Sequence, residues 1–327
     1  YYDVTATKMN TLTPNSQDVI SRLEGGLTIT SYLNALDEQD IWTASPSRVK
    51  TDQVRFKQYV RFKPDIKLKY VYYYDTIQSL SQDQRFPNLN TEQRAREIMR
   101  IHGLDSSLFL SPGQIREQID LSGEKNMFVR LLERENGEKT FLRVFDDMQH
   151  HPGESEITAA FKRIAMELPT VGFLVGHGER DIHRTGDREY SGFALEKRFR
   201  YALINQGFDI LNVRLTDEVP DNIKILVIAE MKEPLTETEE INLERYIARG
   251  GNLFITCEPK RSEIMNVLLE KFGVRLVTGT LVQLSENFSP DLIVAQPSQE
   301  AAKLNYYFDG MKQNNRCLVM SGAAGLE

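Results

Sequence analysis

Short apolar runs closed by glycine or polar residues recur through the second half of the chain. They predict buried strands at residues 170–175, 208–213, 224–229 and 252–256. An apolar side over residues 193–203 predicts a helix closed by Gly207, and Thr236 with Glu239 forms a capping box that begins another. Strands and helices alternating through short connections predict a mostly parallel sheet with helices on both faces.

Further along, a helix is predicted over residues 261–272, and Gly273 ends it. Four more apolar runs follow, and we expect them to extend the sheet or to return towards the first half of the chain. These runs are residues 274–277, 281–284, 292–294 and 317–320.

The first half has a different pattern, in which strands alternate apolar and polar residues. Helices begin at Pro14, at Pro46 and at Glu154, Thr91 is predicted to cap another, and Asn136-Gly137 lies between two apolar runs as in a hairpin. The remaining strands are predicted at residues 27–33 and 66–72. The order strand, helix, strand, helix, hairpin, helix is that of a thioredoxin-like domain, and the match is one of topology alone.

Leu168-Pro169-Thr170 separates the two patterns, because proline ends the preceding helix and an apolar strand follows at once. We therefore predict an α/β protein of two domains. Residues 1–168 form the thioredoxin-like domain, and residues 169–327 form a flavodoxin-like or class I amidotransferase-like domain.

Composition narrows the classes of partner. The 327 residues include 40 Lys and Arg against 47 Asp and Glu, a formal charge of -7, so a nucleic-acid partner is not expected. Two cysteines without a C-x-x-C pair indicate neither a redox pair nor a zinc knuckle. His150 and His151 are adjacent and chelate poorly, and no phosphate-binding motif with its lysine is present. We expect no metal and no cofactor.

Ligands of an open parallel sheet bind beyond the carboxyl ends of its strands. The loops that follow the predicted strands supply the candidate ligand- or partner-binding residues. Two alternatives remain for the first loop: its glycines shape a tight turn in which the polar side chains bond each other, or those side chains present a binding edge. The candidates are Gly176, His177, Gly178, Glu179, Glu230 and Glu258.

The enzymatic alternative is a nucleophilic Cys257 paired with His177, as in a hydrolase or an amidotransferase. An amidotransferase nucleophile needs glycines on both sides of its strained turn, whereas Thr256 and Glu258 flank this cysteine. We therefore expect no catalytic residues. A weaker reading is sugar binding through Tyr72, Tyr73 and Tyr74, although adjacent strand residues point to opposite faces and favour core packing.

Three segments, read together, resemble a known family. Residues 3–26 contain Leu12-Thr-Pro14, residues 27–33 match a first strand, and residues 171–251 contain Gly176-His-Gly-Glu179, Pro234-Leu235 and Tyr246-Ile-Ala-Arg-Gly-Gly251. In this order they resemble the extracytoplasmic auxiliary component of a bacterial ABC transporter system, a family that includes the gliding-motility-associated GldG-like proteins.

The resemblance implies a non-catalytic binding or scaffolding module on the periplasmic face of the inner membrane, beside an ABC permease and an ATPase. It also implies a protein partner or a small ligand such as a glycan. The chain begins at Tyr1 without methionine and ends in Leu326-Glu327. We therefore expect it to be part of a longer protein that is anchored in the membrane through segments outside this sequence.

Overall fold

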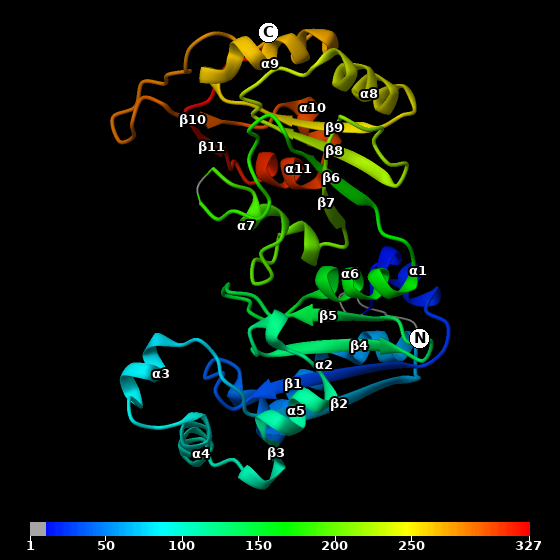
Figure 1. Cartoon of the computed structure of the whole chain (residues 1–327), viewed down its shortest axis with the longest axis vertical. Coiled ribbons are helices and arrows are strands. Elements are labelled where there is room, and N and C mark those ends of the chain that lie inside the picture. The colour runs from blue at the N-terminus through cyan, green and yellow to red at the C-terminus, as the bar shows by residue number, and fades with distance from the viewer. Residues whose placement is uncertain (1–10, 187) are drawn as a thin grey trace. The chain divides into compact units, whose positions relative to one another are not determined.

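The computed structural model describes residues 11–186 and 188–327, which fall into two compact units (Figure 1). The first unit comprises the described part of Tyr1–Pro169 together with Ser191–Asp209, and the second comprises Thr170–Tyr190 and Ile210–Glu327. The sequence pattern predicted one division near residue 168 and did not indicate this return of the chain to the first unit. Residues 3–10, which carry part of the family resemblance, lie outside the described residues.

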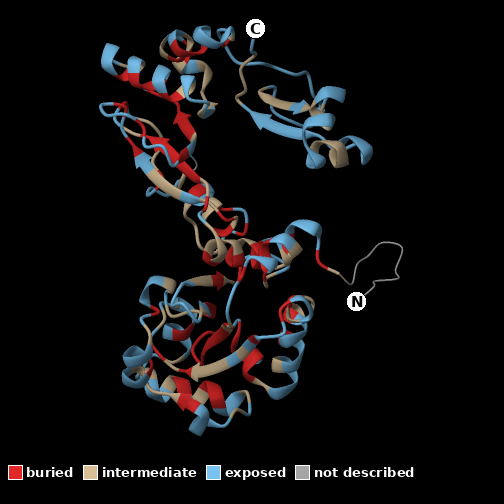
Figure 2. Cartoon of the chain, turned by 90° about the vertical axis from the view of Figure 1, so that its right-hand side faces the viewer, coloured by how far each residue is buried: buried red, intermediate tan, exposed pale blue. Residues whose placement is uncertain are grey.

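A mixed five-stranded sheet in the order β3-β2-β1-β4-β5 forms the centre of the first unit. The central strand β1 runs parallel to β2 and antiparallel to β4, and the β4–β5 hairpin turns at Gly137, whose φ is 89°. The buried positions, red in Figure 2, are concentrated in β1 and β4, the interior strands of highest burial. The strands are β1 (Leu27–Asn34), β2 (Ile66–Tyr73), β3 (Phe109–Leu110), β4 (Val129–Arg134) and β5 (Lys139–Arg143).

Helices cover both faces of this sheet. On one face, α1, α2 and α6 enclose a core in which the Tyr59 and Phe161 rings meet edge to face at 4.9 Å. On the other face, Ile115 of α5 packs beside Tyr73 and Val129. The helices are α1 (Pro14–Ser21), α2 (Pro46–Phe62), α3 (Leu80–Arg85), α4 (Thr91–Ile101), α5 (Pro112–Gln118) and α6 (Glu154–Ala165).

The structure corrects the predicted cap of α4 and agrees with the predicted packing of the three tyrosines. Asn90 caps α4 rather than Thr91, because Asn90 and Gln93 satisfy each other's backbone amides in a capping box. The three tyrosines divide as strand geometry requires. Tyr73 is fully buried on one face, while Tyr72 and Tyr74 are partly buried on the other, so the rings form no common platform.

The segment Ser191–Asp209 is not the predicted helix. Only α7 (Ser191–Ala194) is helical, followed by a short 3-10 turn at Leu203–Asn205. The Asn205 side-chain amide donates to the carbonyls of Glu196, Lys197 and Phe199, which a continuous helix would have paired with its own amides. The apolar spacing was therefore overridden by side-chain contacts.

Arg200 fastens this segment to the first unit. Arg200 is 4% exposed, and its guanidinium donates to Glu156 at 2.7 Å and to Asp147 at 2.7 and 2.9 Å. It also lies over the Phe145 ring at 4.5 Å. The partners of this arginine lie 44 and 53 positions earlier in the chain, so no local sequence pattern predicts these ion pairs.

The second unit is built on a four-stranded sheet in the order β7-β6-β8-β9, with β8 parallel to both β6 and β9. The predicted mostly parallel sheet is confirmed. Because β6 lies between β7 and β8, the order of strands reverses between β6 and β8, which makes this the topological switch point. The strands are β6 (Thr170–Leu174), β7 (Asp209–Val213), β8 (Ile223–Ala229) and β9 (Asn252–Thr256).

Helices α8 (Glu237–Ala248) and α9 (Ser262–Leu269) pack on the same face of this sheet, against Leu226 and Ile228. Thr236 and Glu239 form the predicted capping box of α8. On the opposite face Phe173 meets the loop residue Tyr190, with ring centroids 6.0 Å apart. The helix predicted over residues 193–203, between β6 and β7, does not form, and its residues belong to the first unit.

The C-terminal strands were predicted only in part. Residues 274–277 and 281–284 form no strand, and Leu276, the one buried residue of the first run, makes a single bridge to Leu326. The remaining runs do not extend the sheet. They pair antiparallel as a separate two-stranded sheet, β10 (Leu292–Ala295) and β11 (Leu318–Ser321), with α10 (Gln299–Leu304) and α11 (Tyr306–Gln313) between them.

Within residues 11–186 and 188–327, none of the helices combines the length and the apolar character that crossing a bilayer requires.

Candidate functional site

The loops that follow β6 and β8 meet at the switch point of the second unit. The Lys232 amide donates to the His177 carbonyl at 2.7 Å, and the Arg180 amide donates to Ala229 at 3.3 Å. The amide of Glu230 donates to Thr256 at 2.9 Å, which ties the third loop to the second. The structure therefore brings the predicted residues of all three loops to one rim of the sheet.

Glycines are required in the first of these loops for two reasons. Gly176 and Gly178 have φ values of 131° and 74°, a region that side chains other than glycine rarely adopt. A Cβ on Gly178 would also lie 3.0 Å from Cδ of Lys232. The loop is shaped by the close approach of its backbone to the β8 loop.

His177 lies inside this loop with both ring nitrogens engaged. Its side chain is 7% exposed, Nδ1 lies 2.9 Å from Oε1 of Glu179, and Nε2 lies 3.1 Å from Oε2 of Glu239. The His177 amide also donates to Glu179 at 2.7 Å. Of the two alternatives for the loop, the structure shows the internal hydrogen bonds between His177 and Glu179.

The surroundings of His177 favour the imidazolium. Burial works against the charged ring, but hydrogen bonds to Glu239 and Glu179 outweigh it and raise the pKa of His177. Burial likewise disfavours the Glu239 carboxylate, whereas the amide and hydroxyl of Thr236 and the His177 ring lower its pKa. The cap of α8 and the β6 loop are therefore joined by one charged group, a second role for Glu239 that the capping box did not reveal.

Arg180 organises the other half of the rim. Its guanidinium donates to Glu230 at 3.3 Å and to Glu258 at 2.5 Å, and it lies 5.7 Å from the centre of the Tyr190 ring. Glu230 is 6% exposed and adopts a φ of 52°, which strains a residue other than glycine. The sequence did not single out Arg180, because its partners lie 50 and 78 positions away.

Cys257 is poorly suited to nucleophilic attack. Burial and the nearby Glu230 carboxylate raise the pKa of the thiol, which disfavours the reactive thiolate. His177 has carboxylates on both ring nitrogens, so neither nitrogen is available as a base for this sulfur. The hydrolase or amidotransferase alternative is not favoured.

Comparison with known proteins indicates the class of protein to which this region is similar. Residues 168–326 match the model of a family described as an ABC-type uncharacterized transport system. The match supports the interpretation of this region as an auxiliary component of an ABC transport system, a class that associates with transporter components. Membership of such a class suggests a non-catalytic role.

No curated protein matches the chain. Among solved structures, it is similar to the mmIFT52 N-terminal domain, with 16% identity and a TM-score of 0.35 over 48% of this chain and 67% of that chain.

Proposed function

We propose that the chain is a non-catalytic binding and scaffolding module of an ABC transporter complex of the gliding-motility type. It acts on the periplasmic face of the inner membrane, contacts the permease and ATPase assembly, and is anchored through segments outside this sequence. The observation that carries the proposal is the family match over residues 168–326.

The exposed apolar surface of the matched region supports a protein partner. Tyr306 and Tyr307 of α11 are 83% and 74% exposed, and all four residues of β11 are exposed (Figure 2). Two-stranded sheets are marginally stable alone, and exposed apolar patches mark interaction sites. We propose that β11 and α11 form the partner surface.

The rim at the switch point is proposed as a further contact. His177, Glu230 and Glu258 hold the loops in place through their ion pairs, while Gly176 and Gly178 remain exposed. The backbone of the glycine loop is therefore the part of this rim that a partner or a small ligand such as a glycan can reach.

Affinity purification from detergent-solubilised membranes of cells that express the parent protein tests the proposal. Mass spectrometry is expected to identify the permease and the ATPase with the wild-type chain. Replacing both tyrosines, Tyr306→Ser with Tyr307→Ser, is expected to reduce this recovery at least about tenfold, because exposed aromatic residues dominate many protein interfaces.

The matched control is Phe199→Ser with Tyr201→Ser, an exposed aromatic pair of the first unit with ring centroids 5.8 Å apart, against 5.7 Å for the tyrosine pair. The control should retain both subunits. If wild type recovers no transporter subunit, the proposed function is wrong; equal recovery by both variants would reject β11 and α11 as the partner surface.

The proposed compartment can be tested through Cys317, which is free and exposed. A membrane-impermeant maleimide is expected to label the protein in intact spheroplasts, and Cys317→Ser should remove most of the label, since Cys257 is partly buried with a raised thiol pKa. Labelling that requires lysis of the spheroplasts would place the chain in the cytoplasm and contradict the proposal.

A further inference from the structure

The first unit contains a cavity of about 380 Å³ that the proposed function does not use. Ligand-binding pockets usually have volumes of roughly 300–1,000 Å³. The loop after β1, one side of α2 and the loop before α6 enclose it. Its ionisable lining residues are Asp40, Arg48, Asp52, Arg55, His150 and His151. Burial and the nearby Arg130 and Arg55 lower the pKa of His151 to about 4, so this ring is neutral.

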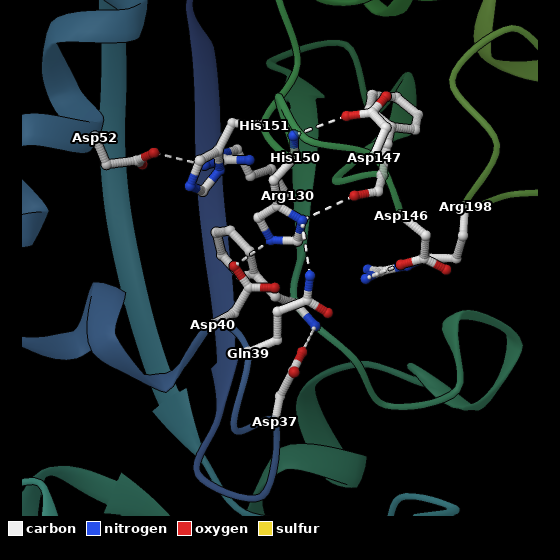
Figure 3. Close-up of polar contacts among 12 residues, drawn as sticks. Asp37, Gln39, Asp40, Asp52, Arg130, Asp146, Asp147, His150, His151 and Arg198 are labelled. Atoms are coloured by element: carbon white, nitrogen blue, oxygen red, sulfur yellow. Dashed lines mark hydrogen bonds and ion pairs between the residues drawn. The ribbon is translucent and has the colours of Figure 1, made fainter.

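The cavity opens where ligand sites form in sheets of this kind. Strand β5 is antiparallel to β4, and β4 is antiparallel to β1, so β1 and β5 point the same way. The loops that carry Asp40 and the two histidines therefore leave the sheet at the same edge, and Figure 3 shows them converging. His150 adopts a φ of 57°, a strained conformation at the wall of the cavity.

Positive charge is in excess at the cavity. Asp52 is neutralised from behind by the fully buried Arg130 at 2.6 Å, and Asp40 lies 2.9 Å from Nε2 of His150. Nε of Arg55 donates a hydrogen bond to Asp52 at 3.2 Å. Arg48 is exposed and makes no ion pair with any residue that the structure describes.

This arrangement suits an anion. Arg48 and Arg55 lie seven positions apart on α2 and both line the cavity, so their guanidinium groups face it from the same side of the helix. Arginine donates two parallel hydrogen bonds to carboxylate or phosphate groups, and this geometry makes it the preferred cation for such ligands.

Asp40 supplies a second, independent requirement. It is 3% exposed and lines the cavity, yet its Oδ2 has no hydrogen-bond partner among the described residues. Its Oδ1 is held by His150, as Figure 3 shows. A buried carboxylate oxygen without a donor is costly, and a hydroxyl or amine on a bound molecule would satisfy it.

We infer that this cavity binds a small molecule that carries an anionic group, carboxylate or phosphate, for Arg48 and Arg55 together with a hydroxyl or amine for Asp40. The site lies wholly within the first unit, outside the region of the family match. Binding by the purified chain is thus independent of whether a permease is recovered, so this inference and the proposed function can fail separately.

Isothermal titration of the purified chain with two pairs of probes tests the inference. Glycerol 3-phosphate is compared with inorganic phosphate, and lactate is compared with acetate. In at least one pair the hydroxylated anion is expected to bind about tenfold more tightly, the effect of one hydrogen bond to a charged group. Phosphatidylglycerol vesicles form a separate arm. Binding to these vesicles, but not to phosphatidylcholine or to the soluble probes, would assign the anion to a lipid headgroup.

Two variants separate the requirements. Arg48→Gln should weaken every anionic probe about tenfold, whereas Lys50→Gln, an exposed cation on the same helix that does not line the cavity, should not. Asp40→Asn should reduce the preference for the hydroxylated anion, and it should not weaken inorganic phosphate, because it removes a negative charge from the cavity lining. If Asp40→Asn fails to fold, the comparison of Arg48→Gln with Lys50→Gln still tests whether the cavity binds the anion.

The inference is overturned if no probe and no vesicle binds. It is also overturned if Arg48→Gln and Lys50→Gln weaken binding equally, which would indicate a general attraction of anions to α2. Equal affinity for hydroxylated and plain anions in both pairs would reject the role of Asp40.

Discussion

Replacing Asp52 with alanine is expected to lower the free energy of unfolding of the first unit by about 3–5 kcal/mol. Arg130 is fully buried, and Asp52 is its ion-pair partner at 2.6 Å. The guanidinium also lies over the Phe128 ring at 4.5 Å, and its Nε and Nη1 already lack partners among the described residues. Without Asp52, the buried cation loses its countercharge. Hydrogen exchange of the β1 and β4 amides measures this loss for the first unit alone.

Two further variants interpret the result. Asp52→Leu combined with Arg130→Met should recover most of the stability, because replacing both buried charges with apolar groups removes the unpaired ion. Asp18→Ala, in the exposed pair with Arg22, should cost no more than about 1 kcal/mol. A loss below about 1 kcal/mol for Asp52→Ala would show that Arg130 finds another partner and that the pair is not structurally important.

The second large effect is expected in the second unit, where His177→Met should cost about 3–5 kcal/mol. The substitution leaves the Glu179 and Glu239 carboxylates, whose side chains are 2% and 9% exposed, facing each other without a cation. Hydrogen exchange of the β6 and β8 amides reports the loss. The control His183→Met removes an exposed histidine of the same loop region and should change little.

This contribution depends on pH in a defined direction. Because the folded pKa of His177 is raised above its ordinary value of 6.5, the imidazolium stabilises the fold fully below about pH 6.5 and is lost as pH rises through the folded value. The difference in stability between wild type and His177→Met should therefore shrink on the alkaline side. A difference that grows with pH would contradict the charged state of the ring.

Local patterns in the sequence predicted most of the fold. The strands of both sheets other than β3, and the capping box of α8, depend on residues within a few positions of each other, and they form close to the predicted places. The two-residue strand β3 was not predicted. The helix over residues 193–203 failed because Arg200 and Asn205 make contacts that local spacing does not encode. Residues 281–284 are apolar enough for a strand but, within the described part of the chain, make only isolated backbone hydrogen bonds, from Leu281 to Ala323 and from Gln283 to Pro290.

The candidate site shows the same limit. The rule that sites lie at the carboxyl ends of parallel strands placed His177 and Glu230 on one rim. Arg180, which joins the acids of that rim, was missed because its ion pairs link distant positions. The cavity of the first unit was missed for the same reason, since its lining joins α2 to the loop that carries His150 and His151, about 100 positions away.

The return of Ser191–Asp209 to the first unit has a consequence for synthesis. A nascent chain that ends at Pro169 already contains Asp147 and Glu156, but the ribosome has not yet made the arginine that neutralises them. The N-terminal unit therefore completes its folding only after β6 and the glycine loop of the other unit have emerged. Until β7 and β8 have been synthesised, the apolar strand β6 has no neighbouring strand to pair with. It is therefore the segment that a chaperone would have to shield.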